Sequence, residues 1–206
     1  MSNDCCSSND YNSNDKYRII LWIVLLINLS MFFTEIIFSL SSGSQSLLAD
    51  SLDFFSDTAN YAISIYVLNK VITTRAKAAL FKGYCMALLG FWVLISTIYK
   101  LFSDTIPQAE TMGTIGLIAL LANILCAFLL YKYRNGDSNR ASVWICSRND
   151  AIANLAVILA ALGVGITNTK WPDLAVAALI IILTLSGSVQ IIKKAKRDLN
   201  PVIEAY

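Results

Sequence analysis

The sequence predicts an all-α polytopic membrane protein, with six transmembrane helices in one bundle. Composition and six long apolar runs carry this prediction. Hydrophobic residues make up 56% of the 206-residue chain, charged residues only 15%, and the mean hydropathy is +0.60. Soluble domains usually contain about 25% charged residues. The composition therefore excludes a soluble or disordered protein, and a net charge of +2 is too small to indicate a nucleic-acid-binding protein.

The six apolar runs are each long enough to cross a hydrocarbon core about 30 Å thick as a helix. They are continuously apolar and far exceed the about 9–11 residues of a membrane strand, which favours helices. The runs cover residues 19–40, 46–69, 79–102, 112–133, 141–166 and 174–192. Short connections join them, and Pro172 stands where it suits the start of the sixth helix.

Polar segments flank the membrane domain, which we place at residues 17–195. Residues 1–16 are rich in Ser, Asn and Asp and lack the basic start and early apolar core of a secretory signal. We expect them to form a disordered cytosolic tail, and residues 196–206 to form a short second tail. Cysteine usage indicates no disulfide framework, because the number is odd and two cysteines are adjacent. The five are Cys5, Cys6, Cys85, Cys126 and Cys146.

Basic residues predict that both termini are cytosolic. Thirteen Lys and Arg residues lie on one side of the predicted membrane, against Lys100 and Lys170 on the other. Cytosolic connections carry the excess of Lys and Arg in membrane proteins, and an even number of helices agrees. The thirteen are Lys16, Arg18, Lys70, Arg75, Lys77, Lys82, Lys132, Arg134, Arg140, Lys193, Lys194, Lys196 and Arg197.

The second run carries Asp50, Asp53 and Asp57, which a lipid-facing helix does not tolerate. Each Asp costs about 2.5–3.5 kcal/mol at mid-bilayer, whereas each Leu, Ile, Phe or Val contributes only about 0.3–0.6. Spacings of three and four place the carboxylates on one helix face, where their repulsion is relieved by protons or cations. The stripe favours a cation pathway, with a buried polar network that holds helices together as the alternative.

The fifth run offers a partner pair, because Cys146 and Asp150 are also one turn apart. Two such pairs on facing helices supply four ligands, the number that a tetrahedral divalent site needs. In an antiparallel arrangement we expect Asp57 level with Cys146, and Asp53 level with Asp150. The alternatives are an ion pair of Asp150 with Arg148, and a buried, inert thiol at Cys146.

Two segments resemble the cation diffusion facilitators, six-helix transporters that move divalent metal out of the cytosol in exchange for protons. The family's second helix commonly reads leucine-leucine-x-aspartate, then histidine or aspartate, then aspartate four residues later. Residues 46–57 read Ser-Leu-Leu-Ala-Asp-Ser-Leu-Asp-Phe-Phe-Ser-Asp. The fifth helix of the family repeats the pair, and residues 150–158 fit the stretch that follows it. The resemblance covers roughly residues 17–195.

This resemblance implies a metal site formed by Asp53, Asp57, Cys146 and Asp150, with Cys146 where the family usually has His or Asp. One thiolate and three carboxylates suit borderline divalent ions. We expect Zn²⁺ as the transported ion, with Co²⁺, Fe²⁺, Ni²⁺, Cd²⁺ and Mn²⁺ open, and no permanent cofactor. The expected partners are metal ions, protons and the lipid bilayer, and the expected location is the plasma (inner) membrane.

The family usually carries a cytosolic metal-binding domain after the sixth helix, and often a His-rich loop between the fourth and fifth. This sequence has no His, and it ends at Tyr206. We therefore expect a short form that lacks that domain. A homodimer stays open, because dimerisation through the missing domain does not carry over.

Several acids and thiols keep open roles. Asp50 either supports the metal ligands or the proton path, or is a helix-start acid near the outer surface. Glu35, the one charge in the first run, either pairs with Arg148 or lies wet near the outer interface. Cys5 and Cys6 either capture metal at the entrance or belong to a solvated tail.

A metal exporter that exchanges metal for protons by alternating access is the favoured function. One alternative is an intramembrane enzyme that uses paired aspartates. It lacks support, because the chain has no His and no Gly-x-Ser-x-Gly element. The other alternative is a membrane metal sensor or partner that binds metal without transporting it. We therefore predict that the protein is not an enzyme.

Overall fold

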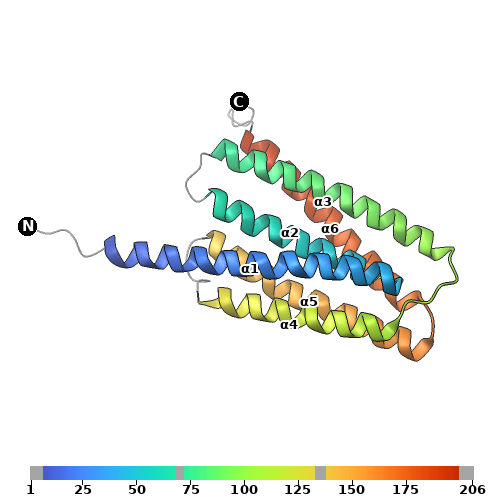
Figure 1. Cartoon of the computed structure of the whole chain (residues 1–206). Coiled ribbons are helices and arrows are strands. Elements are labelled where there is room, and N and C mark those ends of the chain that lie inside the picture. Colours follow the sequence, from blue (N-terminus) through green and yellow to red (C-terminus); the bar gives the residue numbers. More distant parts are fainter. Residues whose placement is uncertain (1–6, 68–71, 133–137, 200–206) are drawn as a thin grey trace, which may run out of the picture.

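The computed structural model describes residues 7–67, 72–132 and 138–199, and within these ranges the chain is helical with no strand (Figure 1). Six helices stand where the six apolar runs predict them. They are α1 (Ser7–Ser42), α2 (Gln45–Val67), α3 (Ile72–Leu101), α4 (Ala109–Tyr131), α5 (Ser138–Thr167) and α6 (Trp171–Leu199).

Four of the helices, α1, α3, α4 and α6, are long and apolar enough to cross a membrane by themselves. The acidic stripe lowers the hydropathy of α2, and in α5 only the part Ala153–Thr167 is strongly apolar. Helix α2 packs against four other helices, whereas α5 exposes apolar side chains such as Leu159 and Ile166 as a lipid-facing helix does. The sequence prediction is therefore confirmed. The protein is an all-α, multi-pass integral membrane protein.

Helix α2 lies at the centre of the bundle. It packs against α1, α3, α5 and α6, whereas the closest pairs are α1 with α2, α3 with α6, and α4 with α5 (Figure 1). A central position removes the acids of α2 from lipid, where charged side chains are costly. The helix arrangement therefore keeps the acids of α2 away from lipid, as the sequence of α2 requires.

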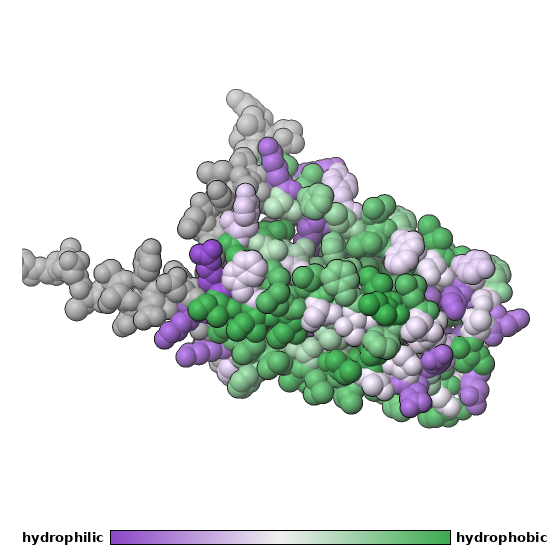
Figure 2. Space-filling model, in the orientation of Figure 1, coloured by the Kyte–Doolittle hydropathy of each residue, from purple (hydrophilic) through white to green (hydrophobic). Residues whose placement is uncertain are grey.

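Large apolar side chains remain exposed along the outer faces of α1, α3, α4 and α6. Figure 2 shows them as a broad apolar belt, with hydrophilic side chains gathered toward the ends of the bundle. In water such a surface would drive association, whereas a lipid bilayer solvates it. Examples are Phe33, Phe91, Phe128 and Leu183.

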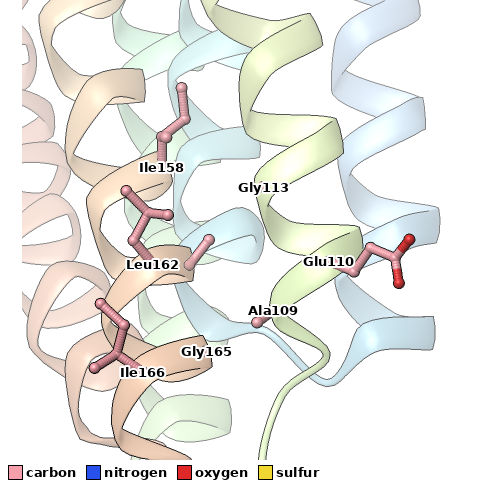
Figure 3. A pocket seen from close by; sticks show the side chains of 8 residues that line it. Ala109, Glu110, Gly113, Ile158, Leu162, Gly165 and Ile166 are labelled. Carbon is pink, nitrogen blue, oxygen red and sulfur yellow. The ribbon is translucent and has the colours of Figure 1, made fainter.

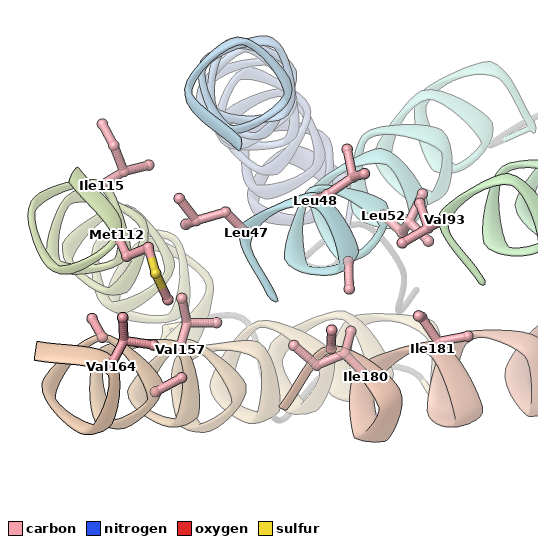
Figure 4. Packing of buried hydrophobic residues seen from close by; sticks show 14 residues of the cluster. Leu47, Leu48, Leu52, Val93, Met112, Ile115, Val157, Val164, Ile180 and Ile181 are labelled. Atoms are coloured by element: carbon pink, nitrogen blue, oxygen red, sulfur yellow. The ribbon is translucent and has the colours of Figure 1, made fainter. Parts of the chain in front are cut away.

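The main apolar core lies between α2 and the helices around it. Side chains from α2, α3, α4, α5 and α6 meet there (Figure 4). The core packs the first half of α2 so tightly that every residue from 44 to 52 is buried. Its labelled members are Leu47, Leu48, Leu52, Val93, Met112, Ile115, Val157, Val164, Ile180 and Ile181.

A single buried carboxylate, Asp173 in the first turn of α6, caps the start of α2. It accepts hydrogen bonds from the backbone N–H groups of Gln45 (2.8 Å) and Ser46 (2.9 Å). It also accepts from the hydroxyls of Ser44 (2.8 Å) and Ser46 (2.6 Å). The first N–H groups of a helix lack partners within the helix and carry partial positive charge, so an anion is stabilised there. Asp173 therefore ties α6 to α2.

Further bonds close the same end of the bundle, which is the outer end in the predicted orientation. The backbone N–H of Gln108 donates to the carbonyl of Ser42 (3.0 Å). The Lys170 ammonium donates to the carbonyl of Leu101 (3.0 Å). The three outer connections are thus joined to one another by hydrogen bonds.

The helices extend beyond the apolar runs at several ends. The sequence predicts a disordered tail over residues 1–16, whereas α1 begins at Ser7; residues 1–6, with both tail cysteines, lie outside the described ranges. Helix α6 continues to Leu199, into the predicted second tail. Extending a formed helix needs no new nucleus, so polar turns continue from an apolar span.

We expect Asp173→Ala to lower the free energy of unfolding by about 2 kcal/mol, because the substitution removes a helix cap and a charged hydrogen-bond acceptor. Thermal unfolding of the purified protein in detergent measures this. Asp104→Ala is the matched control, because Asp104 is exposed in the neighbouring α3–α4 connection. An equal effect of the two substitutions would contradict the capping role.

Candidate metal centre

The three acids of α2 lie on one face of the helix, turned toward the other helices. Asp50 and Asp57 are buried, and Asp53 is half-buried. The exposure of α2 changes along its length. Every residue from 44 to 52 is buried, whereas from 58 to 66 only Tyr61 is. The carboxylates therefore span the passage from a tightly packed outer half to a looser inner half.

Asp57 has more polar and charged neighbours than the other carboxylates of the stripe. The Tyr61 hydroxyl, one turn on, donates a hydrogen bond to its Oδ2 (2.9 Å). From α5, the carboxyl of Asp150 comes within hydrogen-bonding reach of Asp57. Lys82 of α3 is an electrostatic neighbour of Asp57 and donates to the side chain of Asn60. Four residues from three helices thus surround this carboxylate: Asn60 and Tyr61 of α2, Lys82 of α3 and Asp150 of α5.

Asp53 lies one turn further out, between α2 and α6. The hydroxyl of Thr184 on α6 donates to its Oδ1 (3.4 Å). Its other electrostatic neighbours are the carboxylates of Asp50 and Asp57. Carboxylates this close repel one another when all are ionised, so the cluster favours bound protons or cations.

Three of the four predicted ligands, Asp53, Asp57 and Asp150, are electrostatic neighbours in the structure, whereas the fourth lies outside the described side chains. Cys146 stands in α5 one turn before Asp150, and its side chain, like that of Arg148, is not among those described. Among the described side chains, no three Cys, Asp or Glu residues are arranged to hold a metal ion. The four-ligand site remains a prediction.

The register of α5 against α2 differs from the expected one. The sequence places Asp150 level with Asp53, whereas in the structure its carboxyl contacts Asp57 first, with Asp53 as a more remote neighbour. This is a shift of about one turn. Packed helices cross at an angle, so residue counts in an ideal antiparallel pair do not fix which side chains meet.

Helix α5 carries buried polar atoms without hydrogen-bond partners among the described residues. Asn154 is almost fully buried, and neither its Oδ1 nor its Nδ2 has a partner among the described residues. The same holds for Oδ2 of Asp150, one turn earlier. Buried polar atoms are rarely left unpaired. Asp150, which contacts Asp57, therefore keeps one carboxylate oxygen available as a ligand.

The comparisons with known proteins point the same way. The family described as "cation efflux transmembrane domain" matches residues 21–200, most of the chain. The chain belongs to the cation efflux family. The family's description as a cation efflux domain agrees with the prediction that the protein is not an enzyme.

Similar curated proteins are transporters of bacteria. The cadmium, cobalt and zinc/H(+)-K(+) antiporter of Bacillus velezensis is 24% identical over 200 residues, which cover 88% of this chain and 61% of the relative. Zinc transporter ZitB of Yersinia pseudotuberculosis is 23% identical, with 91% and 64% covered. The metal cation efflux system protein CzcD of Cupriavidus metallidurans is 23% identical, with 89% and 61% covered. The chain thus spans less than two thirds of the length of these relatives.

Two residues of this cation efflux domain gain a role that the sequence did not assign. Lys82 counts as a cytosolic loop charge in the sequence, yet it lies buried within α3 and faces Asn60. Tyr61 lies one turn after Asp57 on the same face of α2 and has no predicted role. Its spacing of four from Asp57 is the one signal in the sequence that points to the contact.

Glu35 lies deeper than the sequence suggests. The expectation of a wet position near the outer interface is wrong, because Glu35 is fully buried. Its described partner is the carboxyl of Asp50 on α2, within hydrogen-bonding reach. Asp50 is fully buried as well, so it is not a surface acid at the helix start.

A hollow of about 300 Å³ between α4 and α5 is separate from the acidic cluster (Figure 3). Small residues, Ala109, Gly113, Ala161 and Gly165, form it, and the acidic Glu110 points away from it. An apolar lining of this kind suits a lipid chain and gives an ion no ligands. The hollow is therefore not the metal centre.

We expect Tyr61→Phe to weaken metal binding by about 10- to 100-fold, since groups that orient a metal ligand have effects of this size. Calorimetric titration of the purified protein with Zn²⁺ measures the affinity. Tyr99→Phe, on the exposed face of α3, is the matched control. Equal affinities of the two variants would show that Tyr61 does not orient a ligand.

Proposed function

We propose that the protein exports divalent metal from the cytosol in exchange for protons. The observation that carries the proposal is the convergence of Asp53, Asp57 and Asp150, from two helices, inside a membrane domain of the cation efflux family. A stripe of mutually repelling carboxylates away from lipid is stable only with positive charge beside it. A transported divalent ion supplies that charge.

Proton exchange follows from the chemistry of the ligands. Carboxyls and thiols bind metal in their deprotonated forms, so an arriving ion displaces the protons they hold. The ion with its two positive charges and the displaced protons then move in opposite directions. On the outer side, protons compete with the metal for the same oxygens, and the protonated carrier returns.

The burial of α2 supports a state that faces the cytosol. Its outer half is packed without gaps and capped by Asp173, whereas side chains of the inner half are half-exposed. Access from the inner side and closure on the outer side is one of the two states that alternating access requires. This interpretation uses the predicted cytosolic position of the termini.

We propose Zn²⁺ as the main ion, held by Asp53, Asp57, Asp150 and Cys146. Three carboxylates and one thiolate form a mixed hard and soft ligand set, which suits Zn²⁺ and extends to Co²⁺ and Cd²⁺. The names of the relatives mention zinc, cobalt and cadmium, which supports this choice. The similarity to bacterial transporters also supports the plasma membrane as the location.

We expect Asp57→Asn and Asp150→Asn each to reduce metal-driven proton flux to the background of protein-free liposomes, because each removes a ligand and a proton carrier. A metal-sensitive dye and a pH-sensitive dye inside reconstituted liposomes measure the two fluxes. Asp104→Asn, in an exposed connection, is the control. Flux within twofold of wild type in both variants would refute the exporter proposal, and metal binding without flux in the wild type would favour a sensor.

We expect Cys146→Ser to weaken Cd²⁺ binding about tenfold or more while changing Mn²⁺ binding less than threefold, since thiolates prefer soft metals. Competition titrations of the two ions on the purified protein measure the difference. Cys85→Ser on α3 is the matched control, because Cys85 is a free thiol on a helix without predicted ligands. Equal losses for Cd²⁺ and Mn²⁺ would show that Cys146 is not a ligand.

A further inference from the structure

A second acidic pair lies between α1 and α2, separate from the predicted ligands. Glu35 and Asp50 are both 0% exposed, and their carboxyls come within hydrogen-bonding reach of each other. Helices α1 and α2 form one of the closest pairs of the bundle, which holds the two carboxyls together.

Among the described residues, neither carboxyl has the partners that buried acids normally have. No described residue donates a hydrogen bond to any of their four oxygens. The other electrostatic neighbour of Glu35 is Asp53, a further acid. A buried carboxylate is normally paired with a base or supplied with donors. This pair has neither among the described residues, so its four oxygens are free to bind a positive ion.

The pair lies on the outer side of the candidate metal centre. Glu35 is seven residues before the end of α1, and Asp50 is five residues after the start of α2. At 1.5 Å per residue these depths are about 10 Å and about 8 Å from the outer helix ends, against about 18 Å for Asp57. Asp50 is about 5 Å along the helix from Asp53. An ion that moves outward from the centre therefore meets this pair next.

We propose that Glu35 and Asp50 form a second binding position for a divalent cation, between the metal centre and the outer face. Its ligands are carboxylate oxygens only, so it favours harder ions than the thiolate-containing centre does. The ion binds to the deprotonated carboxylates, because carboxyl ligands must lose their protons before they bind metal. The binding itself is independent of transport, whereas the role as a step on the exit route rests on the proposed exporter function.

A purely structural role accounts for the pair less well. Polar residues that join membrane helices work through hydrogen bonds with donors, such as the bond from Thr184 to Asp53. Two acids without donors repel each other once ionised. Placing both at a closely packed helix interface is costly unless positive charge is bound there at some stage.

The first test isolates the pair in the full-length protein. In the double variant Asp57→Asn/Asp150→Asn the predicted centre is disabled, and Mn²⁺ binding is measured by equilibrium dialysis. We expect residual Mn²⁺ binding that Glu35→Gln, added to the same background, weakens at least tenfold. Glu110→Gln is the matched control, because Glu110 is exposed at the start of α4. Absence of residual binding, or residual binding that Glu35→Gln leaves unchanged, would overturn the proposal.

The second test separates this proposal from the exporter function. In otherwise wild-type liposomes, Glu35→Gln and Asp50→Asn are expected to lower Zn²⁺ flux at least tenfold, while calorimetry shows Zn²⁺ affinity of the centre within threefold of wild type. Both substitutions preserve side-chain shape, and thermal unfolding checks the fold. Flux equal to that of Glu110→Gln in both variants would refute the exit position and leave the exporter intact. Failure of the exporter itself would appear instead as flux within twofold of wild type in both Asp57→Asn and Asp150→Asn.

Discussion

The burial of carboxylates in a membrane is the constraint on which this architecture depends. Helix α2 carries three acids within about two turns. Exposing this stripe to lipid would cost more free energy than the apolar residues of α2 supply. The bundle answers by enclosing α2 between α1, α3, α5 and α6. Three of these four helices, α1, α3 and α6, are apolar enough to span a membrane alone. The need to keep these acids away from lipid therefore accounts for the central position of α2 in the bundle.

The same helix is held very differently at its two ends. At the outer end, Asp173 satisfies the first N–H groups of α2, and Leu47 and Leu48 are locked into the apolar core. At the inner end, most side chains of α2 are partly exposed. Opening the outer side therefore requires breaking the Asp173 contacts and separating packed apolar residues, whereas the inner side needs less rearrangement. In the predicted orientation, the described state is therefore closed on the outer side and more open on the inner side.

The sequence predicts the helices and the acidic stripe but not how the helices are rotated. Hydropathy runs locate all six helices, and the spacing of Asp50, Asp53 and Asp57 places them on one face, because both properties are local. The contact of Asp150 with Asp57 and the burial of Lys82 depend on crossing angles and helix rotation. These are set by side-chain packing among five helices, which one sequence does not reveal.

The distribution of partners along the stripe relates the two proposed positions. On the inner side, Asp57 has the Tyr61 hydroxyl and the charge of Lys82 beside it. Further out, Asp53 has one hydroxyl, and the Glu35–Asp50 pair has no donor among the described residues. Uncompensated negative charge thus increases toward the outer face. On the proposed exit route, a cation moves toward carboxyls with fewer compensating partners, and its release requires protons that neutralise them.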